Sequence, residues 1–167
     1  MKWRLLVAAL VTLVTLIGLP ARATRNAQTT ADEPHYLLTA LSLFEDQSFD
    51  YGDERSELRY WPFHSVTLPV QAEVQDDGRR VAPHDPLLPV VLAVPMGLGG
   101  WPLAKATIAI LAGALAAAIA WVLERRVGMR PMVAATSAVI AGCSPPLVIY
   151  GTQIYPEIPW ALAALLE

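Results

Sequence analysis

The segment from Leu103 to Leu123 constrains the fold more than any other part of this 167-residue chain. It is an apolar run rich in alanine and leucine, with Trp101 and Trp121 near its two ends. About 20 apolar residues in a helix are enough to span the hydrocarbon core of a bilayer, and tryptophan is enriched at the membrane–water interface. The segment therefore predicts a transmembrane helix, with expected bounds 101–123.

The composition agrees with a membrane protein. Apolar residues make up 54% of the chain and charged residues 16%, and the mean hydropathy is +0.42. Soluble domains carry about 25% charged residues, so we predict an all-α membrane protein. The lone cysteine, Cys143, lies in an apolar run, so the sequence offers neither a disulfide framework nor a cysteine-based metal motif.

The charges concentrate between residues 31 and 85. This stretch holds twelve of the fifteen acidic residues, four of the twelve basic residues and all three histidines, which gives it a formal charge of −8. Proteins that bind nucleic acid need a basic surface, so no nucleic-acid partner is expected. An acidic stretch is usually a solvated surface, and it can also hold cations.

The first apolar segment, residues 1–23, has two interpretations. A helix from Trp3 to Ala21 would be roughly 28 Å long, which suits a transmembrane anchor with two basic residues before it. The alternative is a cleaved signal peptide, because Ala21-Arg22-Ala23 has the small-x-small form of a cleavage site. The later spans favour the anchor.

A third span is expected over residues 132–150, where small side chains allow close helix packing. Ser144-Pro145-Pro146 should kink or end this helix, because proline cannot donate the backbone hydrogen bond. A polar turn follows in residues 151–167 and opens another apolar helix, inside which the chain stops.

The loop 124–131 fixes the expected orientation. It is the most basic short loop of the chain, and the positive-inside rule places such loops in the cytoplasm. The N-terminus is then cytoplasmic too, while residues 24–100 and 151–167 are extracytoplasmic. The sequence thus predicts a multi-pass protein of the cell membrane whose partner is the lipid bilayer.

The outer loop, 24–100, is expected to carry two interfacial helices. The first lies near 32–46, where Leu37, Leu38, Leu41 and Phe44 recur at helical spacing and polar residues fall on another face. The second, near 86–97, is apolar but too short and too rich in proline to span, so it lies at the interface or is partly re-entrant. Between them the sequence indicates an irregular loop with a hairpin around Asp77-Gly78.

Candidate functional residues cluster in the outer segments. Asp32 and Glu33 fit either a helix cap or chemistry, and His84-Asp85 fits either a binding pair or a turn before proline. Glu157 suits the first turn of a helix, where it complements the dipole. His35 and His64 are interpreted as solvated or hydrogen-bonded loop histidines.

The order of several short motifs resembles the N-terminal part of the polytopic GT-C glycosyltransferases of the protein mannosyltransferase and aminoarabinose transferase kind. The resemblance extends from about Leu5 to the end of the chain. The motifs are Asp32-Glu33-Pro34-His35-Tyr36, Pro83-His84-Asp85-Pro86-Leu87-Leu88-Pro89, Ser144-Pro145-Pro146 and Gln153-Ile154-Tyr155-Pro156-Glu157.

This resemblance implies a bundle of transmembrane helices that transfers a sugar from a polyprenyl-phosphate carrier on the outer side of the membrane. By position, Asp32 would be the base or acceptor-positioning group, and Glu33 its acidic neighbour. His84, Asp85 and Tyr155 would contact the substrate. A divalent metal ion, if used, would be held by Glu157 and His84.

The chain departs from this family in two respects. Relatives place a lysine beside the proline, where this chain has His84 and Asp85, so phosphate pairing by a fixed positive charge is weakened and a metal is favoured. Relatives also continue through many further helices, so the chain is interpreted as an incomplete copy or fragment.

The alternative function is a non-catalytic small membrane protein whose acidic outer loop binds cations or a partner. The oligomeric state is not predicted.

Overall fold

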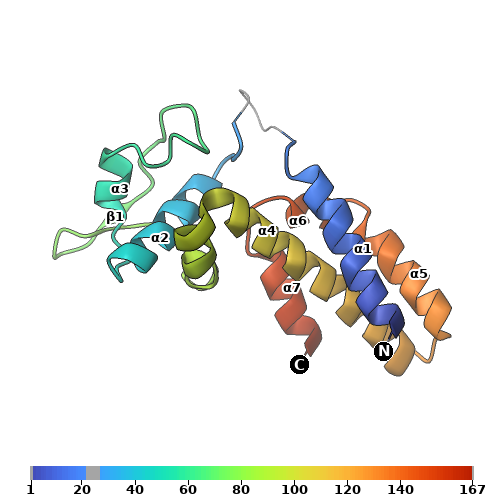
Figure 1. The fold of residues 1–167 in the computed structure, drawn as a ribbon. Helices are drawn as coiled ribbons and strands as arrows, with labels where there is room; N and C mark the ends of the chain where they lie inside the picture. Colours follow the sequence, from blue (N-terminus) through green and yellow to red (C-terminus); the bar gives the residue numbers. More distant parts are fainter. Residues whose placement is uncertain (1, 22–26, 167) are drawn as a thin grey trace. The chain divides into compact units, whose positions relative to one another are not determined.

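A computed structural model describes residues 2–21 and 27–166 of the chain, which is mostly helical (Figure 1). The elements are α1 (Lys2–Gly18), α2 (Glu33–Glu45), α3 (Gly52–Ser56), β1 (Glu73–Val74), β2 (Arg80–Val81), α4 (Leu87–Arg125), α5 (Pro131–Gly142), α6 (Leu147–Gly151) and α7 (Glu157–Leu166). The predicted helical class is confirmed. The chain divides into two units, residues 1–19 with 105–167 and residues 20–104, which are described separately.

Helix α4 is the one helix in the described part of the chain that is long and apolar enough to cross a membrane. Its most apolar window has a mean hydropathy of 2.3. The helix is interrupted at Gly100, whose φ of 63° and ψ of −164° are not helical. Glycine tolerates this conformation because it has no Cβ. The predicted break between the segments 86–97 and 101–123 is thus found at Gly100.

The prediction that Ser144-Pro145-Pro146 kinks or ends the helix expected over 132–150 is confirmed. Helix α5 ends at Gly142, and the short helix α6 begins only at Leu147. Two consecutive prolines lie in between, and proline neither donates the helical hydrogen bond nor fits the preceding turn. The twelve residues of α5 extend about 18 Å, which is short of a bilayer core. A bundle of several spanning helices is therefore not established by helix lengths.

The first unit is built around α1. Its core joins α1 to the second part of α4 and to α5, through small and β-branched residues: Val7, Val11, Ala116, Ala120, Ala135 and Ala138. A Cβ on Gly142 would lie 2.9 Å from a methyl group of Val11, so the helices approach closely at this glycine. Helix α1 thus supplies part of this core, and its interpretation as a membrane anchor stays a prediction. The expected cleavage motif includes Arg22 and Ala23, which lie outside the described residues.

The two ends of α1 contact different parts of the first unit. The Arg4 guanidinium pairs with the Glu124 carboxylate at 3.0 Å, at the C-terminal end of α4. At the other end of α1, a Cβ on Gly18 would lie 3.1 Å from Thr152, just after α6. Helix α1 therefore runs antiparallel to the second part of α4, with the N-terminus beside the basic loop.

The second unit is centred on α2. The sequence predicted a helix with an apolar face and a separate polar face, and the exposure of the polar face was wrong. Every residue from Glu33 to Ser42 is buried, polar and apolar alike. Helix α2 packs closely on the first part of α4, because a Cβ on Gly97 would lie 2.1 Å from the ring of Phe44. Polar side chains on α2 therefore need partners inside the protein.

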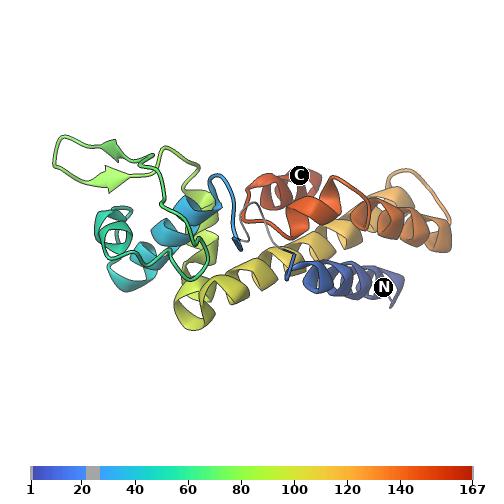
Figure 2. The same ribbon diagram turned by 90° about the horizontal axis from the view of Figure 1, so that it is seen from above.

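The predicted hairpin is confirmed. Strands β1 and β2 are antiparallel (Figure 2), with Glu73 opposite Val81 and Val74 opposite Arg80. Gly78 in the connecting turn has a φ of 87°, which glycine adopts without strain. The turn is closed by a hydrogen bond from the Gly78 amide to the Gln75 carbonyl.

Candidate functional site

Asp32 and His84 lie side by side in the second unit, although 52 positions separate them in the sequence. The Asp32 carboxylate is 3.9 Å from Nε2 of His84, and Nε2 also lies 3.2 Å from the Gln71 side-chain oxygen. Asp32 occupies the N-cap position of α2, yet its side chain makes no capping hydrogen bond to the described residues. Its side chain is 40% exposed. The carboxylate therefore faces solvent beside an imidazole, where it can accept a proton.

Aromatic rings hold His84 in place. The His84 ring lies 5.1 Å from the Tyr36 ring and 6.0 Å from the His35 ring, measured between centroids. Both partners come from the buried first turns of α2. The segment before α4 is thus fixed against the start of α2, and this contact brings His84 to Asp32.

His35 lies at the centre of this arrangement. Its side chain is fully buried, and Nδ1 is 3.1 Å from the hydroxyl of Tyr51. Nε2 has no hydrogen-bond partner among the described residues. Burial lowers the pKa of His35 to about 4, with a further lowering from the nearby His84. Of the two alternatives for His35, the structure agrees with the hydrogen-bonded one and not with the solvated one, and the ring is buried on α2.

Acid should destabilise the second unit through His35. The pKa in the folded state, about 4, is below the ordinary value of 6.5, so the folded protein resists protonation. This contribution to stability is complete above pH 6.5 and is lost as the pH falls towards 4. A pKa difference of one corresponds to about 1.4 kcal/mol, so the contribution of His35 to this loss is on the order of 2 kcal/mol. It is read as the difference between the original protein and a His35 variant, because the raised pKa of Glu54 acts in the opposite direction in both. Chemical unfolding followed by circular dichroism at both pH values measures it.

The His35→Gln variant is the control for this prediction. Its side chain does not titrate in this range, so its stability should fall less between pH 6.5 and pH 4 than that of the original protein. An equal fall in the two proteins would contradict the assignment of the acid sensitivity to His35.

Glu33 and Asp85 both bond to backbone amides at helix starts. The buried Glu33 carboxylate accepts a hydrogen bond from the Thr30 amide at 2.8 Å. The Asp85 carboxylate accepts one from the Leu87 amide at 2.8 Å, at the beginning of α4. The Leu87 amide is one that the first turn of α4 leaves free, so Asp85 has a capping role. The Thr30 amide lies before α2, so the Glu33 bond fixes the segment that enters this helix.

Tyr155 and Glu157 belong to the first unit, whereas the other predicted site residues belong to the second. The Tyr155 ring meets the Tyr150 ring edge-on, at 6.4 Å between centroids. Glu157 is exposed in the first turn of α7, the position at which an acid complements the helix dipole. A metal ion bound by His84 and Glu157 stays a prediction.

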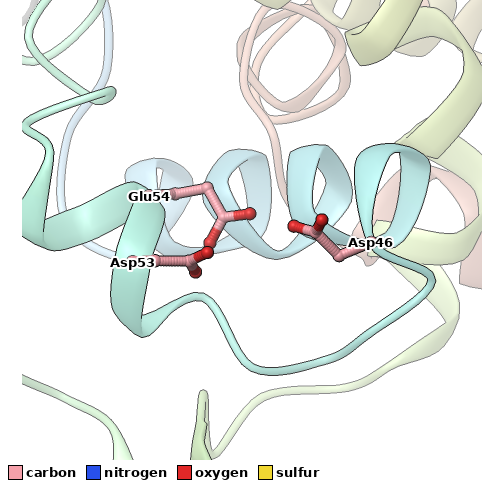
Figure 3. A group of neighbouring side chains, drawn as sticks. All are labelled: Asp46, Asp53 and Glu54. Carbon is pink, nitrogen blue, oxygen red and sulfur yellow. The ribbon is translucent and has the colours of Figure 1, made fainter.

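Sequence reasoning missed an acidic group in the second unit. Asp46, Asp53 and Glu54 come from the end of α2 and from α3, and their carboxylates gather at one place (Figure 3). Among the described residues, these three are potential metal ligands whose carboxylate oxygens lie close to one another. The signal available in the sequence was the charge of −8 on residues 31–85, which does not identify which acids meet.

Comparisons with protein-family models, with curated proteins and with solved structures gave no match. The resemblance to GT-C glycosyltransferases therefore stays a prediction from the sequence.

Proposed function

We propose that the chain belongs to a membrane glycosyltransferase that transfers a sugar from a polyprenyl-phosphate donor to an acceptor on the extracytoplasmic side. One observation carries the proposal. The Asp32 carboxylate is free of the capping role, is partly exposed and lies 3.9 Å from His84. A carboxylate in this setting has the properties of a general base.

In the proposed reaction Asp32 takes the proton from the acceptor hydroxyl. The acceptor oxygen forms a bond to the anomeric carbon of the sugar, and the bond from that carbon to the phosphate oxygen breaks. The electron pair leaves with the polyprenyl phosphate, and attack on the face opposite the phosphate inverts the configuration of the sugar. His84 is proposed to orient Asp32 and the substrate. A divalent cation near the phosphate would stabilise its charge in the transition state.

The membrane arrangement is part of the same proposal. Helix α4 can cross a bilayer by length and composition, but one such helix does not by itself establish a membrane protein. The 17 residues of α1 extend about 26 Å, close to the length needed. The contact of Arg4 with Glu124 supports a common side for the N-terminus and the basic loop. In this arrangement both lie in the cytoplasm and the second unit lies outside.

The proposal is tested by sugar transfer in membranes from cells that express the longest chain encoded by the gene. The donors are a panel of undecaprenyl-phosphate and dolichyl-phosphate sugars with radiolabel in the sugar. We expect the labelled sugar of one donor to be transferred to an acceptor, at a rate proportional to the amount of the chain in the membranes. If no donor reacts faster than in membranes without the chain, the proposal is wrong and the non-catalytic alternative remains.

A further inference from the structure

The connection between α2 and α3 borders a polar cavity of about 490 Å³ in the second unit. Three acids line it, Asp46, Asp50 and Asp53, together with the hydroxyl group of Ser48. Asp50 is engaged in the loop itself, because its carboxylate accepts a hydrogen bond from the Gly52 amide at 2.9 Å. Asp46 and Asp53 are exposed and close together at the cavity wall.

Glu54 is a separate observation that points to a ligand. Its side chain is 1% exposed, and neither of its carboxylate oxygens has a hydrogen-bond partner within the described ranges. Figure 3 shows the Glu54 carboxylate directed at those of Asp46 and Asp53. A buried carboxylate without donors is costly unless a proton or a cation neutralises it. The fold thus holds an acceptor-only group inside an acidic site.

We propose that Asp46, Asp53 and Glu54 together bind a calcium ion. One oxygen from each residue lies within 4.8 Å of the others. At that limit a cation at the centre of the three oxygens would be about 2.8 Å (4.8/√3) from each, so a small shift brings all three to the Ca²⁺–oxygen distance of about 2.4 Å. Mg²⁺ demands strict octahedral geometry and retains several of its waters, so a site that supplies three carboxylates favours Ca²⁺. The all-oxygen donor set also disfavours zinc and copper, which prefer nitrogen and sulfur ligands.

The surroundings agree with this ion. Calcium takes six to eight oxygen ligands, and the adjoining cavity leaves space for water to complete the shell. Arg80 lines the same cavity and adds a positive charge to its wall, which opposes a cation. The site uses neither Asp32 nor His84, so the inference does not rest on the proposed transferase activity.

Isothermal titration calorimetry with CaCl₂ tests the site on the full chain in detergent micelles after chelator treatment. We expect one Ca²⁺ per chain, and binding at least about tenfold weaker in Glu54→Gln because one charged ligand is lost. Glu73→Gln is the matched control, since Glu73 is exposed on β1, and it should bind like the original protein. The Arg80→Gln variant should bind Ca²⁺ more tightly, because it lacks the positive charge that Arg80 adds to the cavity wall.

Glutamine has nearly the same size and shape as glutamate, so the Glu54→Gln variant is expected to fold, and circular dichroism verifies this. Asp53→Asn, at an exposed position, is a second variant that should also weaken binding. The proposal is overturned if millimolar Ca²⁺ gives no binding heat. It is also overturned if Glu54→Gln and Glu73→Gln bind equally well, or if Mg²⁺ binds more tightly than Ca²⁺.

Discussion

Replacing Asp32 with asparagine should lower the rate of sugar transfer by about 10²–10⁴-fold, the range that general-base catalysis contributes. The amide has the size of the carboxylate but does not accept the proton of the acceptor hydroxyl. Asp32 makes no capping bond to described residues, so its replacement should leave the start of α2 intact. The measurement is the initial rate of label transfer, corrected for the amount of protein in the membrane.

Asp76→Asn is the matched control for this substitution. Asp76 is exposed in the turn between β1 and β2, so its amide variant should transfer sugar at the original rate. Glu33→Gln should mainly reduce the stability of the protein, because the Glu33 carboxylate bonds to the Thr30 amide. If Asp32→Asn retained more than half of the original rate, Asp32 would not be the base.

The second large effect is expected from Gly113→Ala. A Cβ at position 113 would lie 2.1 Å from the hydroxyl of Thr12 and 2.5 Å from the backbone oxygen of Ala8. A rotamer change can move Thr12 but not the backbone, so α1 would have to shift away from α4. Overpacking of this kind in a core should cost roughly 3 kcal/mol. Chemical unfolding in detergent micelles, followed by circular dichroism, measures the loss.

Gly18→Ala is the comparison for this steric argument. Its added Cβ would lie 3.1 Å from a methyl group of Thr152, which can yield by a small shift. We expect less than about 1 kcal/mol for this variant. Equal stability losses at positions 18 and 113 would mean that α1 and α4 are not packed as described.

The sequence predicted the features that local chemistry decides. The apolar run after Trp101 identified α4, and the glycines and proline around Gly100 marked its interruption. Asp77-Gly78 identified the turn between β1 and β2. In each case a few neighbouring residues determine the backbone, so no information about distant contacts was needed.

The features that depend on distant contacts were missed. The polar residues of α2 resembled a solvent-facing side, but Tyr51 and His84 cover His35. The meeting of Asp46 with Glu54 likewise depends on how α3 packs against α2. The contact of Asp32 with His84 was not predicted: the resemblance gave each residue a role toward the substrate, and no spacing rule connects residues 52 positions apart.

The most direct test of the account is a topology map, because the proposed site requires the second unit to lie on the extracytoplasmic side of the membrane. Reporters fused after Ala82, Arg126 and Glu157 show on which side each position lies. The account predicts that Ala82 and Glu157 are extracytoplasmic and that Arg126 is cytoplasmic. Finding Ala82 and Arg126 on the same side would contradict it.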